Sequence, residues 1–366
     1  MLFSLFVQHT FAQNETEGCE PCSDLLTYVD SNGHTKPVTG LCEWNIKKRQ
    51  VIDSMQALFG KLPIVPNIPP FKQSEDEVVF PPFNTNVLDS IETPHYVRYN
   101  IQFTVAHNES VLAYLYVPKS INKSKLHPAI VALPPTTGRV LIDTKVPYAK
   151  ELAERGYVVI GPEYPGIGEL KDYNFDDDRY DSGIMKGVFN HIRCIDYLQQ
   201  LGYVDIERIG VIGHSLGGHS SIFLGVFDSR VKVIVSSVGW TQMEYYKVKN
   251  GKERYGSRLG AWAQLLYAPL FKSKYHLNDD RFPFNFDELI GALAPRYFFS
   301  NSPIHDSNFN VEGVRVGIAN ASEVYRLYNA ENNIQVRYPI AGHDFPLAIR
   351  NEAYCFIDNV LMSPID

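Results

Sequence analysis

The sequence lacks an apolar run long enough to cross a membrane. After the N-terminal segment, polar or charged residues interrupt every apolar stretch before it reaches the roughly 18 residues that a transmembrane helix needs. An excess of positive charge is also missing, because the net charge is −7 at pH 7. Nucleic acids and anionic membranes attract basic surfaces. We therefore expect neither a membrane span nor a nucleic-acid partner.

Cysteine is scarce, and the 5 cysteines are unevenly spread. Cys19, Cys22 and Cys42 lie close together near the N-terminus. They could form a disulfide in an exported protein, or hold zinc with His34 as the fourth ligand. We favour a disulfide and leave its pairing open.

The first twelve residues have features of an export signal. An apolar run from Leu2 to Val7 is followed by Ala12, after which a cleavage site is plausible, and then by polar residues. No Lys or Arg precedes the run, and the run is short. We predict a signal peptide over 1–12 and a secreted or periplasmic protein; the alternative is a buried terminal segment.

Residues 13–95 are interpreted as an N-terminal arm. Apolar residues recur at helical spacing over 44–59, which predicts an amphipathic helix. Prolines then follow closely between 63 and 82, and they forbid a regular helix or a central strand. This part of the arm is expected to be a proline-rich linker.

Residues 96–366 show the alternation of strands and helices that is typical of a mostly parallel sheet with helices on both faces. The first two strands form an antiparallel hairpin. These features predict an α/β-hydrolase fold. The expected strands are 97–105, 111–117, 128–133, 157–160, 208–212, 231–235, 296–300 and 334–338, and the expected helices are 144–155, 184–201, one after 215, 321–329 and 346–361.

An aromatic-rich segment over 240–290 interrupts the alternation. It is too long for a simple connection between a strand and its helix. We expect an insertion that covers the active-site face. Trp240 and Trp262 from this segment, together with Tyr164 at the end of an earlier strand, are candidate substrate-binding residues, although core packing explains such aromatics equally well.

The strongest chemical signal is Gly213-His214-Ser215-Leu216-Gly217, a G-x-S-x-G pattern between a buried strand and an apolar helix. A nucleophile on such a tight turn projects its hydroxyl from a strained backbone. Bulky side chains two residues before or after it would collide with the neighbouring chain. We predict that Ser215 is the nucleophile.

A serine hydroxyl needs a base, and the base needs an acid that orients it. His343 follows the last strand, as the base should in the chain order Ser, Asp, His. We prefer it to the alternatives His214, His219 and His305. Asp306 lies after the preceding strand and is the predicted acid, with Glu244 as its alternative.

The oxyanion hole should combine two backbone N–H groups. Leu216 follows the nucleophile and supplies the first. The loop after 128–133 supplies the second, and Thr136 is its first possible donor because Pro134 and Pro135 have no N–H. A rigid proline turn without a catalytic part is the alternative.

Neither a cofactor nor a metal is expected. The acidic run over 176–178 could suggest calcium, but an isolated acidic run is usually a solvated loop.

The chain resembles the dienelactone hydrolase and acetyl xylan esterase-like branch of the α/β-hydrolases from residue 96 to the end. The segments GHSLGG, PIHDSNF and AGHDFP carry this resemblance, and the helix near the N-terminus resembles the leading segment of exported bacterial esterases. The resemblance implies hydrolysis of carboxylic esters, often the deacylation of plant or algal polysaccharides. Two departures stand out: dienelactone hydrolases use a cysteine where Ser215 stands, and related esterases lack the two prolines at 134 and 135.

The expected function is therefore a serine-dependent carboxylic ester hydrolase that acts through an acyl-enzyme on a small-molecule or carbohydrate ester. A serine peptidase of the same fold and a non-catalytic binding protein on this scaffold are the alternatives. The sequence does not indicate the acyl group, the alcohol or the oligomeric state.

Overall fold

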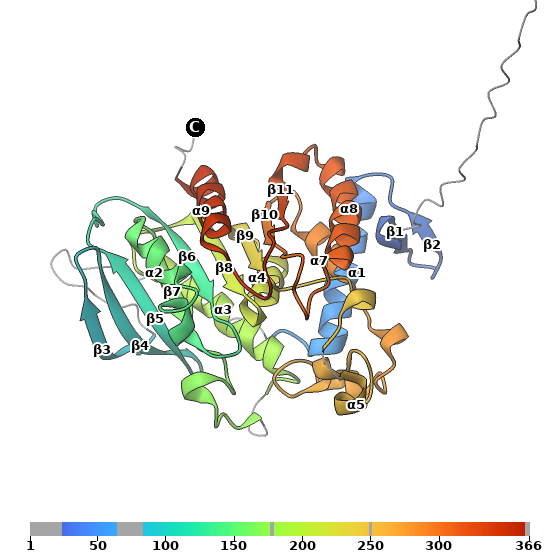
Figure 1. Ribbon diagram of the computed structural model, residues 1–366, viewed down its shortest axis with the longest axis horizontal. Helices are drawn as coiled ribbons and strands as arrows, with labels where there is room; N and C mark the ends of the chain where they lie inside the picture. The colour runs from blue at the N-terminus through green and yellow to red at the C-terminus, as the bar shows by residue number, and fades with distance from the viewer. Residues whose placement is uncertain (1–23, 64–82, 176–178, 249–250, 363–366) are drawn as a thin grey trace, which may run out of the picture.

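A nine-stranded sheet forms the centre of the computed structural model, which describes residues 24–63, 83–175, 179–248 and 251–362 (Figure 1). The strands are β3 (Asn86–Glu92), β4 (Tyr96–Ala106), β5 (Glu109–Pro118), β6 (His127–Leu133), β7 (Val158–Pro162), β8 (Val204–His214), β9 (Val231–Ser237), β10 (Tyr297–Asn301) and β11 (Ile334–Arg337). Their order across the sheet is β11-β10-β9-β8-β6-β7-β5-β4-β3.

The sheet is parallel from β11 to β7 and antiparallel from β7 through β5 and β4 to β3. The expected hairpin is present, and Asn108 turns it with a φ of 59°. Because the carboxyl ends of the parallel strands share one edge, the loops after β6, β8, β10 and β11 converge there. These loops carry most of the residues that the sequence singles out.

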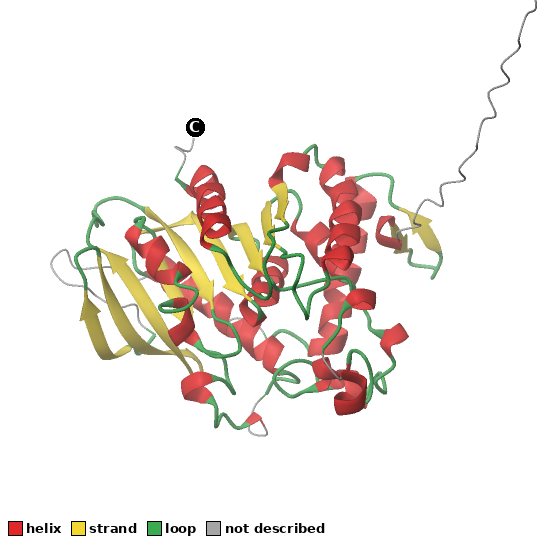
Figure 2. Ribbon diagram, in the orientation of Figure 1, coloured by secondary structure: helices red, strands yellow, loops and turns green. Residues whose placement is uncertain are grey.

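Helices cover both faces of the sheet (Figure 2). Along β6, Ala129, Val131 and Leu133 pack into one apolar cluster, whereas Ile130 and Ala132 pack into the other. Because both faces of β6 are buried, its alternating side chains are all apolar, and the strand appears in the sequence as a continuous apolar run. The first cluster includes residues of α1 (Leu41–Phe59), α3 (Gly183–Gln200), α4 (Leu216–Phe227), α7 (Phe286–Leu293) and α8 (Val311–Leu327); the second includes residues of α2 (Tyr148–Glu154) and α9 (Leu347–Leu361).

The N-terminal arm packs against the helices that cover the sheet. α1 contacts α7, and Trp44 is fully buried beside Gly291 (Figure 1). The sheet begins with β3, before the predicted domain boundary at residue 96, because β3 pairs with β4 as an edge strand. A small hairpin of β1 (Thr27–Val29) and β2 (Thr35–Pro37) precedes α1.

Most predictions for the N-terminal region concern residues that the structure does not describe. The predicted signal peptide, Cys19, Cys22 and most of the proline-rich linker lie outside the described residues. Cys42 is exposed on α1. Within the described ranges, no helix is both long and apolar enough to span a bilayer.

The aromatic-rich insertion folds into short helical turns. These are η5 (Met243–Tyr245), α5 (Gly251–Tyr255), η6 (Gly260–Ala263), α6 (Leu270–Ser273) and η7 (Asp279–Arg281). α7 follows them but belongs to the core, since it packs on α4 and α8. The part of 240–290 that departs from the regular fold therefore ends before α7.

Candidate active site

Ser215 occupies a strained turn between β8 and α4. Its φ of 58° and ψ of −116° lie outside the conformations that L-residues favour. A Cβ on Gly213 would lie 2.0 Å from the carbonyl oxygen of Gly217, and a Cβ on Gly217 would lie 2.0 Å from that of Leu133. Glycine is therefore required at both positions, as the G-x-S-x-G pattern predicts.

The structure brings Ser215, His343 and Asp306 into one hydrogen-bonded chain. The Ser215 hydroxyl lies 2.9 Å from Nε2 of His343, and Nδ1 of His343 lies 2.9 Å from Oδ2 of Asp306. The carboxylate of Asp306 is 1% exposed. Its other oxygen accepts the backbone N–H groups of Asn308 at 2.8 Å and Phe309 at 3.1 Å. The ring of Phe309 stacks on that of His343.

This arrangement suits nucleophilic catalysis. His343 Nδ1–H donates to the buried carboxylate, which leaves Nε2 as the acceptor of the serine proton. Loops after three different strands supply the three side chains, so the carboxyl edge of the sheet holds them together.

The alternative bases and acid lie elsewhere. His214 is buried with Nδ1 3.1 Å from the Ser237 hydroxyl, and burial lowers its pKa to about 3. His305 is not part of the hydrogen-bonded chain: its backbone N–H donates to Ala341. Glu244 accepts from the side chain of Asn285, which caps α7.

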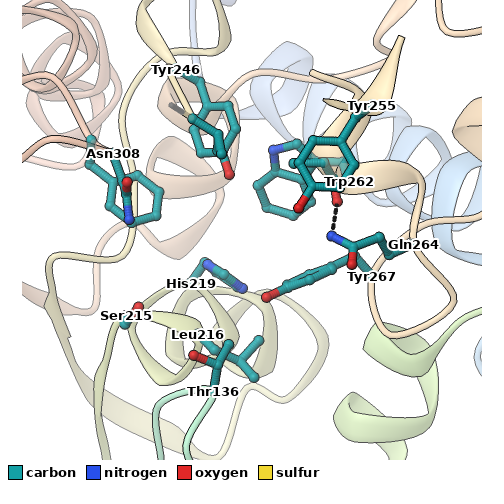
Figure 3. Close-up of a pocket in the computed structure, with 13 residues that line it drawn as sticks. Thr136, Ser215, Leu216, His219, Tyr246, Tyr255, Trp262, Gln264, Tyr267 and Asn308 are labelled. Carbon is teal, nitrogen blue, oxygen red and sulfur yellow. Dashed lines mark hydrogen bonds between the residues drawn. The ribbon is translucent and has the colours of Figure 1, made fainter. Parts of the chain in front are cut away.

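The two predicted oxyanion donors lie beside Ser215. Leu216 is the first residue of α4, and the first N–H groups of a helix have no acceptor within the helix. Thr136 lies next to Leu216 at the rim of the same pocket (Figure 3). Both N–H groups therefore belong to backbone that borders the same pocket as the Ser215 hydroxyl.

A pocket of about 210 Å³ opens above Ser215 (Figure 3). The insertion supplies more than half of its lining, which consists of Thr136, Ser215, Leu216, His219, Tyr246, Val248, Tyr255, Ala261, Trp262, Gln264, Tyr267, Asn308 and Phe309. No Asp, Glu, Lys or Arg is among these residues. The pocket thus presents aromatic faces and neutral hydrogen-bonding groups.

His219 forms part of the pocket wall, and its ring lies 5.3 Å from that of Trp262. Its ring nitrogens make no hydrogen bond of ordinary geometry within the described residues. Burial lowers its pKa to about 3, so it is a neutral group at pH 7. The sequence offers it only as a rival base, whereas the structure makes it a polar pocket residue.

Of the three candidate substrate-binding aromatics, only Trp262 lines this pocket. The prediction for Trp240 is wrong: its indole does not line the pocket but donates to the Ser300 hydroxyl at 2.9 Å and packs on Phe286. Tyr164 also lies outside the pocket lining; it is 2% exposed and packs edge-on against His191. Both rings belong to the core, for which their types are as well suited as for a pocket.

Residues that the sequence did not assign complete the pocket. Tyr246, Tyr255 and Tyr267 were visible as members of the aromatic insertion, and Asn308 and Phe309 as part of PIHDSNF. Gln264 carried no signal. The described residues contain no group of three or more His, Cys, Asp or Glu that could hold a metal ion. The acidic run at 176–178 lies outside these residues.

Comparison with known proteins agrees with this geometry. A sequence model of the family described as "Glucuronyl esterase, fungi" matches residues 175–329, a range that contains Ser215 and Asp306. Among curated proteins, the chain is 24% identical to the putative hydrolase YtaP of Bacillus subtilis. The match extends over 220 residues, which make up 58% of this chain and 68% of YtaP.

Solved structures are similar over most of the chain. A glucuronoyl esterase from Solibacter usitatus superposes with a TM-score of 0.67 at 18% identity, and covers 92% of this chain and 98% of its own. The chain has the α/β-hydrolase fold. A putative acetyl xylan esterase from Bacteroides fragilis superposes with a TM-score of 0.54 at 15% identity, and covers 86% of this chain and 85% of its own. The expected class, a serine-dependent ester hydrolase, agrees with these names.

Proposed function

We propose that this α/β-hydrolase cleaves a carboxylic ester of a carbohydrate through a Ser215 acyl-enzyme, and that esters of uronic acids are its first candidate substrates. The observation that carries the proposal is the hydrogen-bonded chain from the Ser215 hydroxyl through His343 to Asp306, with 2.9 Å at each step. Few side-chain arrangements other than a nucleophile, a base and an orienting acid require this order.

The mechanism follows from the geometry. His343 Nε2 takes the proton as Ser215 attacks the ester carbonyl, and the N–H groups of Leu216 and Thr136 hold the oxyanion. His343 then returns the proton to the leaving alcohol, which gives the acyl-serine. A water molecule activated by the same nitrogen releases the acid. Throughout, Asp306 keeps the imidazole in the tautomer that leaves Nε2 free.

The pocket supports a carbohydrate as the substrate. A ring such as that of Trp262 can stack on the apolar face of a sugar, while His219, Gln264 and Tyr267 offer neutral groups for its hydroxyls. A volume of about 210 Å³ favours one sugar-sized group over a long acyl chain. An esterified uronic acid carries no charge, which suits lining residues without Lys or Arg. The family model and the Solibacter structure, both described as glucuronyl or glucuronoyl esterases, support the same substrate class.

Ser215→Ala is the primary test. We expect wild-type protein to hydrolyse short-chain nitrophenyl esters and to be labelled by a fluorophosphonate probe, and the variant to do neither while keeping its circular dichroism spectrum. Activity of the variant at the wild-type level would contradict the nucleophile. A panel of methyl and benzyl glucuronate esters, acetylated xylan and feruloylated arabinose would then rank the substrates; equal rates on all of them would argue against a uronate preference.

A serine peptidase is the alternative function with the same chemistry. Enzymes that remove short peptides anchor the substrate amine with carboxylates, and the pocket lining contains none. We expect no release of dipeptides from chromogenic substrates. The same assay run beside the ester panel distinguishes the two activities.

We also propose that the protein is exported, as its first twelve residues suggest. Mass spectrometry of the N-terminus of the mature protein tests this: a terminus near residue 13 supports cleavage, whereas an intact Met1 contradicts it.

A further inference from the structure

One motif of the sequence has no part in the triad or the pocket. The segment Glu163-Tyr164-Pro165-Gly166-Ile167-Gly168 follows β7, and β7 pairs with β6, whose own loop carries Thr136. The two loops therefore leave the sheet side by side. The loop after β6 continues into η2 (Arg139–Ile142), so Glu163 and the turn over 134–138 are neighbours.

The carboxylate of Glu163 is bonded to the end of that turn. It is 1% exposed, and its oxygens lie 3.2 and 3.4 Å from the backbone nitrogen of Arg139. The backbone N–H of Tyr164 lies 3.4 Å from the same group. Within the turn, the N–H of Gly138 donates to the carbonyl of Pro135 at 3.0 Å. Glu163 thus fixes the residue at which the turn ends.

Two glycines leave room for this carboxylate. Gly138 has a φ of 90°, and a Cβ there would lie 3.1 Å from Oε2 of Glu163. Gly168 has a φ of 56°, and a Cβ there would lie 2.3 Å from the same oxygen. The positive φ disfavours a side chain at both positions, and at Gly168 the carboxylate also leaves no room for one. One carboxylate therefore lies against both the glycine that ends the turn and the second glycine of the motif.

The guanidinium of Arg139 completes the arrangement. It is fully buried, lies 4.1 Å from the ring centroid of Tyr114 and donates from Nη2 to Glu169 at 2.9 Å. Its Nε lies 3.8 Å from Glu163. Because the guanidinium is buried against the ring of Tyr114, the backbone of Arg139 has little freedom to move away from the carboxylate.

We propose that Glu163 is a positioning residue for the oxyanion hole, which acts by holding the backbone of Arg139 and thereby sets the turn that presents the N–H of Thr136. This inference rests on the proposed hydrolase function. It accounts for a buried carboxylate that contacts no member of the triad. The first end of the turn is fixed independently, because the Tyr148 hydroxyl donates to the carbonyl of Leu133.

Glu163→Gln tests the proposal, with Glu169→Gln as the matched control. The amide that Glu163→Gln introduces would keep the shape of the carboxylate but replace one of the two oxygens that face the backbone N–H of Arg139 with an –NH2 group, which cannot accept. Glu169 contacts the same guanidinium but is 47% exposed, and within the described residues its carboxylate makes no bond to the turn. We expect kcat on p-nitrophenyl acetate to fall about 10- to 100-fold in Glu163→Gln with KM within about two-fold, because oxyanion contacts form in the transition state. Glu169→Gln should stay within about three-fold of wild type.

An aryl trifluoromethyl ketone separates positioning from general damage. It forms a hemiketal with Ser215 whose oxyanion occupies the hole, whereas the matching methyl ketone remains largely unreacted. Rates are expressed per active site titrated with a fluorophosphonate. We expect the trifluoromethyl ketone to weaken by the same factor as kcat, and the methyl ketone to bind as in wild type.

If Glu163→Gln fails to fold, Gly138→Ala perturbs the same contact from the turn side and should give the same selective loss. Wild-type kcat in a folded Glu163 or Gly138 variant, or equal weakening of both ketones, overturns the positioning role. Loss of activity in Ser215→Ala beside such a result leaves the proposed function intact, so the two failures are distinguishable.

Discussion

Asp306→Asn should disable the base without removing it. The two oxygens of Asp306 have different partners: Oδ1 accepts the N–H groups of Asn308 and Phe309, and Oδ2 accepts from Nδ1 of His343. An asparagine that keeps its oxygen on the two N–H groups must turn its –NH2 toward His343. Nδ1 then becomes an acceptor, and the ring proton moves to Nε2, where it faces the Ser215 hydroxyl and cannot accept its proton.

The magnitude follows from the opposite orientation of the amide. Flipping it to restore the productive tautomer leaves two buried N–H groups without an acceptor, at about 1–3 kcal/mol each. A total of about 2–6 kcal/mol reduces the productive population by roughly 30-fold to 10⁴-fold, since about 1.4 kcal/mol corresponds to a factor of ten. We expect kcat on p-nitrophenyl acetate to fall within this range. The free energy of unfolding should change by no more than about 1 kcal/mol, because the contacts on Oδ1 are kept.

Asp344→Asn is the matched control. Asp344 follows His343 directly but its side chain is exposed, so kcat should stay within about two-fold of wild type. Urea denaturation of both variants measures folding, and steady-state kinetics measures kcat. A folded Asp306→Asn protein that keeps more than a third or so of wild-type kcat would refute the tautomer argument and remove Asp306 from the mechanism.

Three further changes test other parts of the molecule. Gly217→Ala places a Cβ 2.0 Å from the carbonyl oxygen of Leu133, so we expect a loss of about 3 kcal/mol or more in urea denaturation and no fluorophosphonate labelling; near-normal stability would contradict the predicted collision. Burial lowers the pKa of His191 from 6.5 to about 3, so the folded state resists its protonation and the free energy of unfolding falls as the pH drops below 6.5. His191→Phe should reduce this pH dependence by about 1.4 kcal/mol per pH unit between pH 6 and 4. An unchanged slope would show that His191 is not the group responsible. Trp262→Ala should raise KM for methyl glucuronate about ten-fold and leave p-nitrophenyl acetate nearly unaffected, whereas equal effects on both substrates would argue against sugar stacking.

Patterns with a short period made the core of the fold predictable. Buried strands such as β6 appear as apolar runs, and the hairpin of β4 and β5 appears as alternation around a turn, so local sequence alone indicates them. β3 was missed because it is an edge strand whose residues are all exposed, and no burial pattern marks it. Its pairing with β4 depends on the position of the sheet edge, which no local pattern encodes.

The hydrogen-bonded arrangement of Ser215, His343 and Asp306 was predictable for a different reason. Chain order and strand ends locate Ser215, Asp306 and His343, because parallel strands bring their carboxyl ends to one edge whatever the loops between them do. The glycines at 213 and 217 add a steric requirement that only a tight elbow imposes. Chain order, strand ends and the two glycines can all be recognised in the sequence without knowing how the loops fold.

The pocket depends instead on how loops fold over that edge. Trp240 and Trp262 lie in the same aromatic segment and both belong to the buried apolar cluster, but only Trp262, on η6, also lines the pocket beside Ser215. Both are 1–2% exposed, so neither residue type nor burial separates them. The path of the insertion decides which of the two rings lines the pocket. The insertion therefore supplies most of the pocket lining, whereas the loops at the strand ends supply Ser215, Asp306 and His343. Because different segments carry the two, the pocket can change while the hydrogen-bonded chain stays the same.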